Sequence, residues 1–141
     1  MKMRFCLLFG LVGAFSAPCS AQEKLGELID SGAKKLSAEE MRTLVVGANL
    51  TGPGAKNTTS DVDLLPDGTA KGFVYAGGRG YRFQGTYKIM DDGKICLHYE
   101  FVNTFPPYEA CVAYYQAGQQ YYLAYSDTDR EAQVVKRVVK R

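Results

Sequence analysis

The chain has 141 residues, with 17 lysines and arginines against 15 acidic residues, a formal charge of +2 and one histidine. This length is enough for one domain with its own core, but hardly for two. Since so small a charge creates no overall positive field, we predict no nucleic-acid partner.

Residues 1–21 have the composition of a secretory signal peptide. Lys2 and Arg4 provide a short positive segment, and the apolar run over 5–15 is too short to span a bilayer. Small residues then lead to a cleavage site between Ala21 and Gln22. We therefore expect a periplasmic or secreted protein that begins at Gln22.

Lipidation at Cys19 is the alternative fate of this segment. It would need an aliphatic residue three positions earlier, where the chain has Ser16. The sequence therefore favours ordinary cleavage over a lipid anchor.

Cleavage changes the charge and the cysteine count of the chain. It removes two basic residues and no acidic one, which leaves 15 of each sign, and it leaves only Cys96 and Cys111 as cysteines. Two cysteines in an exported protein most simply form one disulfide. No later apolar stretch approaches the ~20 residues that a membrane helix needs, so we predict no transmembrane segment after cleavage.

The segment 22–48 is predicted to be helical. Its leucines and isoleucine recur at helical spacing, interrupted by Gly32. Ser37 and Glu40 have the spacing of a capping box, in which each side chain accepts a hydrogen bond from the other residue's backbone amide. We expect these short helices to cover one end or one face of a sheet.

The segment 49–141 is predicted to be antiparallel β structure. Turn signals such as Asp67-Gly68 and Asp92-Gly93 separate runs rich in Val, Ile, Tyr and Phe. We expect strands at about 61–65, 70–75, 81–89, 94–102, 109–117 and 120–126. The predicted fold class is α+β, one domain over 22–141 in which short helices pack on a β-meander closed as a small barrel or folded as a sandwich.

The cysteines can be placed by the alternation of two predicted strands. Cys96 and His98 share one face of strand 94–102, and Glu109 and Cys111 share one face of strand 109–117. If the two strands form a hairpin, Cys96 can lie opposite Cys111 at a distance suited to a disulfide. The same register sets His98 opposite Glu109.

Catalytic, metal and cofactor signals are weak. His98 beside Glu109 could act as a general base, but no motif places a serine or cysteine nucleophile next to it. One histidine and a bridged cysteine pair cannot build a zinc site, and the acidic run 127–131 lacks the glycine and distal glutamate of a calcium loop. We predict no metal site, no cofactor and no catalysis.

Candidate binding residues come from a glycine-rich loop and from an excess of tyrosine. The loop over 77–82 contains three glycines and carries Arg79 and Arg82, but it does not lead from a strand into a helix as a phosphate-binding loop would. Tyr115, Tyr121 and Tyr122 flank the turn at 118–119 and are candidate contact residues, although tyrosines are also ordinary cross-strand partners.

The order of these features resembles a family of small secreted proteobacterial β-rich proteins of unknown function. The resemblance rests on the segment 28–40, on Asp67-Gly68-Thr69, on Gly85-Thr86-Tyr87 and on the two cysteines. Such families often have tryptophan where this chain has Tyr87. The resemblance implies no catalytic residues, and it favours a closing edge strand over a helix for 132–141, where valines suit either.

Together these observations favour a secreted or periplasmic binding protein without catalytic activity, whose partner is an envelope protein or a glycan. Two alternatives stay open: an inhibitor of a lysozyme-type enzyme, and an envelope hydrolase that uses His98 and Glu109.

Overall fold

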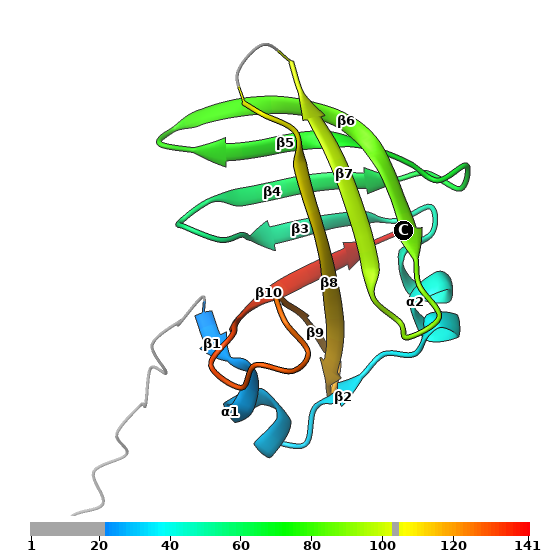
Figure 1. Cartoon of the computed structure of the whole chain (residues 1–141), viewed down its shortest axis with the longest axis vertical. Coiled ribbons are helices and arrows are strands. Elements are labelled where there is room, and N and C mark those ends of the chain that lie inside the picture. The colour runs from blue at the N-terminus through cyan, green and yellow to red at the C-terminus, as the bar shows by residue number, and fades with distance from the viewer. Residues whose placement is uncertain (1–21, 103–104) are drawn as a thin grey trace, which may run out of the picture.

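A computed structural model describes residues 22–102 and 105–141 (Figure 1). The predicted signal peptide, its cleavage site and Cys19 lie outside these residues. In chain order the described elements are β1 (Gln22–Lys24), α1 (Leu25–Asp30), β2 (Lys34–Lys35), α2 (Ala38–Val45), β3 (Asn49–Pro53), β4 (Thr59–Leu64), β5 (Thr69–Ala76), β6 (Arg79–Ile89), β7 (Ile95–Phe101), β8 (Tyr108–Ala117), β9 (Gln120–Ala124) and β10 (Gln133–Lys140).

Strands β3 to β10 form a closed antiparallel barrel of eight strands. Each strand pairs with its neighbours in sequence, and β10 closes the circle because Val134–Arg137 pair with β9 while Val138–Lys140 pair with β3. The closed barrel is one of the two closures that the sequence left open. Within the segment 132–141, Gln133–Lys140 form a strand, as the resemblance favoured, but this strand pairs on both sides and is not an edge.

The predicted α+β class is wrong, because the described structure is 54% strand and only 12% helix. The segment 22–48 is not continuously helical: it opens with β1, and β2 separates the two helices. Gly32, with a φ of +93°, turns the chain after α1, so that helix has only six residues. Two helices of this size form no layer of their own.

α2 covers one end of the barrel. The predicted capping box is present, since the Ser37 hydroxyl accepts from the Glu40 amide and the Glu40 carboxylate accepts from the Ser37 amide. The apolar stripe of the helix, Met41 and Val45, is completely buried in the main core with Phe83. The β3–β4 and β5–β6 connections lie on the opposite side of the barrel from α2 (Figure 1).

α1 packs against the outer face of the barrel. Leu25 and Leu28 are buried there in a second, smaller cluster with Tyr115, Tyr122 and Val134. Alternation along β8 explains the two clusters, because Tyr114 points into the barrel while Tyr115 points outward beneath α1.

Two glycines mark close approaches between strands. A Cβ atom on Gly72 would lie 1.9 Å from the Asp61 carbonyl oxygen, and one on Gly85 would lie 1.8 Å from the His98 carbonyl oxygen. No side chain fits at either point, so glycine permits the strong coiling that lets the sheet close.

The predicted disulfide between Cys96 and Cys111 is confirmed. The two residues are direct partners in the β7–β8 register, and the next pair on the same face is His98 and Glu109, as the alternation predicted. The bridge lies on the outer face of the barrel.

Candidate ligand-binding site

The barrel contains a cavity of about 260 Å³. Inward-facing residues of seven of its strands line the cavity, together with the β3–β4 loop. Most of them are apolar, including Leu50, Val62, Val74, Leu97 and Val112. The period of two along each strand produces this lining, because every second residue of a closed barrel points inward.

The cavity is large enough for a small organic molecule. Its volume exceeds the roughly 150 Å³ of an engineered cavity that stays dry and binds benzene. It lies just below the roughly 300 Å³ at which the usual range of ligand pockets begins. The apolar lining makes the space unattractive to water but favourable for hydrocarbon.

Arg137 is the one charged side chain buried among the described residues, with an exposed fraction of 4%. It lines the cavity. Its Nη1 donates to the Ser60 hydroxyl at 2.9 Å and to the Gly52 carbonyl at 3.0 Å, and its Nη2 donates to the Leu50 carbonyl at 3.3 Å. Among the described residues no carboxylate lies within ion-pair distance of this guanidinium.

The position of Arg137 follows from the way β10 changes partners. Along one edge of β10, pairing with β1 ends at Val135 and pairing with β3 begins at Val138. The Arg137 side chain lies at this interruption and bonds the carbonyls at the end of β3. Arg137 therefore connects β10 to β3 at the seam, the line along which these two strands close the barrel.

Tyrosines surround the guanidinium. Tyr114 is buried beside Arg137; burial raises the pKa of Tyr114, and the nearby cation partly offsets that rise. Burial also raises the pKa of Tyr99 and of Tyr125, so both stay neutral at physiological pH. The side chains around the Arg137 guanidinium thus carry neutral hydroxyl groups.

The β3–β4 loop forms one wall at the end of the cavity away from α2. Gly54, Ala55, Lys56 and Thr58 line the cavity here, and Lys56 is an exposed cation. Lys56 and Asn57 both have positive φ angles, and the Gly54 amide donates to the Thr58 carbonyl at 2.8 Å. This tight loop brings the chain back from β3 into β4.

The binding residues predicted from the sequence do not share a surface. Arg79 and Arg82 are exposed, but they lie on β6 and not in the predicted loop, because the turn between β5 and β6 consists of Gly77 and Gly78 alone. Tyr115 and Tyr122 are buried beneath α1, with exposed fractions of 4% and 9%. Tyr121 is half-buried and packs against the main core beside α2.

His98 and Glu109 form a polar row on the outer face. His98 Nδ1 lies 2.9 Å from a Glu109 carboxylate oxygen, and Nε2 lies 3.5 Å from Glu100. These contacts, with Glu109 first, raise the pKa of His98. Thr86 is the hydroxyl residue opposite His98 in β6, and within the described chain no hydrogen bond joins the two.

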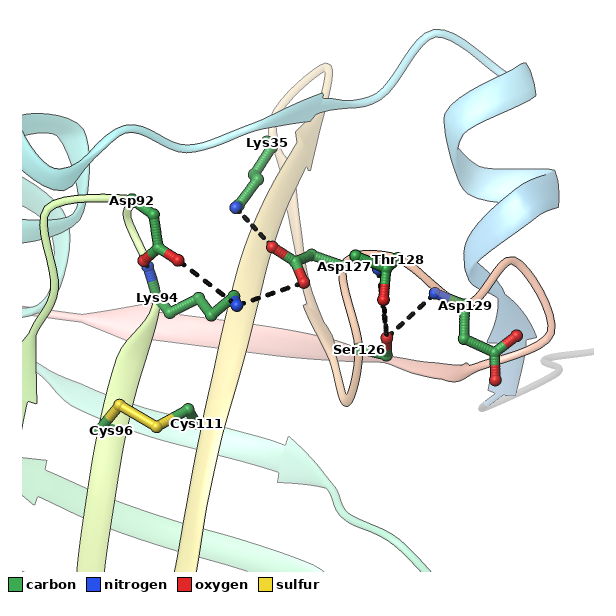
Figure 2. A network of polar contacts seen from close by, with 9 residues as sticks. All are labelled: Lys35, Asp92, Lys94, Cys96, Cys111, Ser126, Asp127, Thr128 and Asp129. Carbon is green, nitrogen blue, oxygen red and sulfur yellow. Dashed lines mark hydrogen bonds and ion pairs between the residues drawn. A yellow bond between two sulfur atoms is a disulfide. The ribbon is translucent and has the colours of Figure 1, made fainter.

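In the acidic run 127–131, Asp127 forms ion pairs with two lysines beside β8 (Figure 2). Figure 2 shows the Asp127 carboxylate between Lys35, at 2.8 Å, and Lys94, at 3.4 Å. The hydrogen bond from Lys35 is the main reason that the pKa of Asp127 lies below its usual value. Within residues 22–102 and 105–141, no group of three metal-ligating side chains is placed to hold a metal ion.

Arg137 and the cavity were missed by the sequence reasoning. Arg137 is one of four basic residues over 136–141, and such a cluster near the end of a chain is typical of solvated charges that protect an edge strand. The alternation of side chains along the strand could have placed Arg137 inside. Arg137 is two positions from Val135 and two from Val139, so all three share one face, and both valines belong to the core.

No helix in the described part of the chain is long and apolar enough to cross a membrane. Comparison of the chain with protein-family models, with curated proteins and with solved structures finds no match.

Proposed function

We propose that this protein is a secreted, non-catalytic binding protein that holds a small, largely apolar molecule inside its barrel. The observation that carries the proposal is the cavity of about 260 Å³ with its predominantly apolar lining. A natural core is packed to high density, so an apolar space of this size loses dispersion contacts unless a ligand fills it.

The secretion part of the proposal rests on two supports. The composition of 1–21 is that of a signal peptide, and a disulfide persists most readily in an oxidising compartment. N-terminal sequencing of the exported protein tests it, with Gln22 expected as the first residue. An intact Met1 on the exported protein would contradict cleavage.

The binding site proposed here differs from the surface suggested by the sequence. Tyr115 and Tyr122 are buried, whereas the interior of the barrel offers a partly enclosed space that is mainly apolar. Enclosure favours affinity because it removes most of a small ligand's surface from water.

The hydrolase and the lysozyme-type inhibitor remain predictions from the sequence. The His98 row lies on the outer face, where the side chains of His98 and Glu109 are 39% and 76% exposed. Such an open row gives a reacting group little protection from water.

A neutral apolar dye, N-phenyl-1-naphthylamine, tests the proposed site. We expect saturable binding with one dye per protein, seen as increased dye emission. Val74→Trp should weaken binding at least tenfold because Val74 lines the cavity and tryptophan would fill it. The matched control is Phe73→Trp, since Phe73 is the neighbouring residue on β5 and is 42% exposed.

Thermal unfolding should show that both tryptophan variants are folded before their binding is compared. If Val74→Trp does not fold, Leu97→Phe at another half-buried lining position replaces it. Absence of dye binding to the unaltered protein, or equal binding by the Val74 and Phe73 variants, would refute a ligand site in the barrel.

A further inference from the structure

The charge of Arg137 indicates what kind of molecule the cavity takes. An arginine remains protonated inside a protein, so a positive charge is enclosed at a wall of a mainly apolar space. An enclosed charge is costly unless an opposite charge or a full set of hydrogen bonds compensates it.

The protein supplies only part of this compensation. The acceptors of Arg137 are backbone carbonyls and the Ser60 hydroxyl, all of which are neutral. The Nε–H group is shielded from solvent and has no hydrogen-bond partner in the described chain. Neutral acceptors hold the guanidinium in place but leave its charge unbalanced.

The other ionisable groups near the guanidinium do not change this balance. Tyr99, Tyr114 and Tyr125 have raised pKa values and carry no charge at neutral pH. Lys56, the other cation that lines the cavity, adds positive charge at the exposed β3–β4 loop. Within the described residues, the cavity therefore contains positive charge without a counterion.

We infer that the ligand is a single-chain amphiphile with a carboxylate head, whose negative charge is held by Arg137 and whose hydrocarbon tail fills the apolar part of the barrel. This inference rests on the proposed function. A single guanidinium matches a monoanion in charge, and in an enclosed site of low dielectric the attraction is much stronger than in water.

A purely structural role for Arg137 is the competing explanation. Its bonds to Leu50, Gly52 and Pro53 join β3 to β10, which is sufficient reason to keep a long donor side chain at the seam. These bonds would persist with or without a ligand. The two roles therefore differ in one measurable property, the preference of the cavity for an anionic head.

Displacement of N-phenyl-1-naphthylamine by decanoate, decanol and decyltrimethylammonium measures this preference. The three compounds share the tail length and differ in the charge of the head. We expect decanoate to displace the dye from the unaltered protein at a concentration at least tenfold lower than decanol, and decyltrimethylammonium to be the weakest competitor.

Two variants assign the preference to a residue. Arg137→Gln should abolish the advantage of decanoate over decanol while dye binding continues. Lys56→Gln is the matched control, because it removes a cation that lines the cavity from the exposed loop, and it should keep the advantage.

A measurement on the unaltered protein covers the case in which Arg137→Gln does not fold. The carboxyl carbon of ¹³C-labelled decanoate should titrate in the complex at a lower pH than in free decanoate, because the guanidinium stabilises the ionised form. A bound carboxyl group that titrates at a higher pH than the free acid would overturn the inference.

Failure of the inference and failure of the proposed function give different results. Dye binding with equal displacement by decanoate and decanol would refute the carboxylate head and leave the apolar site standing. Loss of the preference in Lys56→Gln but not in Arg137→Gln would also overturn the inference. No dye binding at all would refute the site itself.

Discussion

At the scale of single residues, His98 is the side chain whose charge changes near neutral pH, and two carboxylates stabilise its protonated form. The contact with Glu109 is the larger cause of its raised pKa, and Glu100 adds to it. His98 is the one histidine of the chain, so its ring signals in an NMR spectrum need no assignment against others.

We expect the pKa of His98, followed by NMR, to lie above the ordinary value of about 6.5. Glu109→Gln should lower it. Because the folded-state pKa is the higher one, the stabilisation is complete below about pH 6.5 and is lost as the pH rises through the folded-state value. An unchanged titration in Glu109→Gln would show that the carboxylate contact has no effect in solution.

The residue scale also shows where sequence reasoning succeeded and where it failed. Alternation alone placed Cys96 opposite Cys111 and His98 opposite Glu109, since side chains on a strand have a strict period of two. The same rule places Arg137 with Val135, but four basic residues near the end of a chain look like solvated charge. An arginine fits inside the barrel because β10 changes its pairing partner from β1 to β3 at this point and leaves carbonyls of β3 for the guanidinium to bind.

At the scale of elements, the capping box of α2 should stabilise the fold measurably. Ser37→Ala removes the acceptor of the Glu40 amide, and we expect the free energy of unfolding to fall by about 1 kcal/mol. Thr43→Ala is the control, because Thr43 is an exposed residue of the same helix and should change stability by less than about 0.5 kcal/mol. Denaturant unfolding of both variants compares them directly.

The disulfide should contribute more than the cap. The bridged residues are 15 positions apart, and a loop of this length corresponds to about 3 kcal/mol in the chain-entropy model. Cys96→Ala with Cys111→Ala should therefore unfold at lower denaturant concentration than the oxidised protein. Reduction of the unaltered protein should give a similar loss, and an equal midpoint with and without reductant would contradict the prediction.

Elements near one another in sequence were predicted better than the assembly they form. Strands β4 to β9 were expected within a few residues of their observed bounds, because turn residues and alternation are local signals. The strand β3 was not among the expected strands, and its pairing with β10 was not predicted. Leu25 and Leu28 do lie on a helix, but their spacing could not show that this helix lies outside the barrel.

At the scale of the whole molecule, the two hydrophobic clusters should differ in stability. The cluster beneath α1 is small, while the main core extends through the barrel to α2. Leu28→Ala should cost about 2–5 kcal/mol of the local stability of α1. Hydrogen exchange should then speed up in α1 and β1 while the β5 and β6 amides keep their protection.

Equal acceleration of exchange in α1 and in β5 would show that the two clusters unfold together. A suitable comparison is Phe83→Ala, since Phe83 is completely buried in the main core. That variant should lower protection throughout the barrel.

The closure of the barrel by β10 also governs the order of folding. Leu50 and Arg137 are joined across the seam although 87 positions separate them, whereas the disulfide joins residues only 15 apart. Contacts of long sequence separation form late, because a long loop must lose entropy before they form. When the protein refolds with its disulfide intact, the hairpins should therefore precede the seam, and the capacity to hold a ligand should emerge only in the slowest phase.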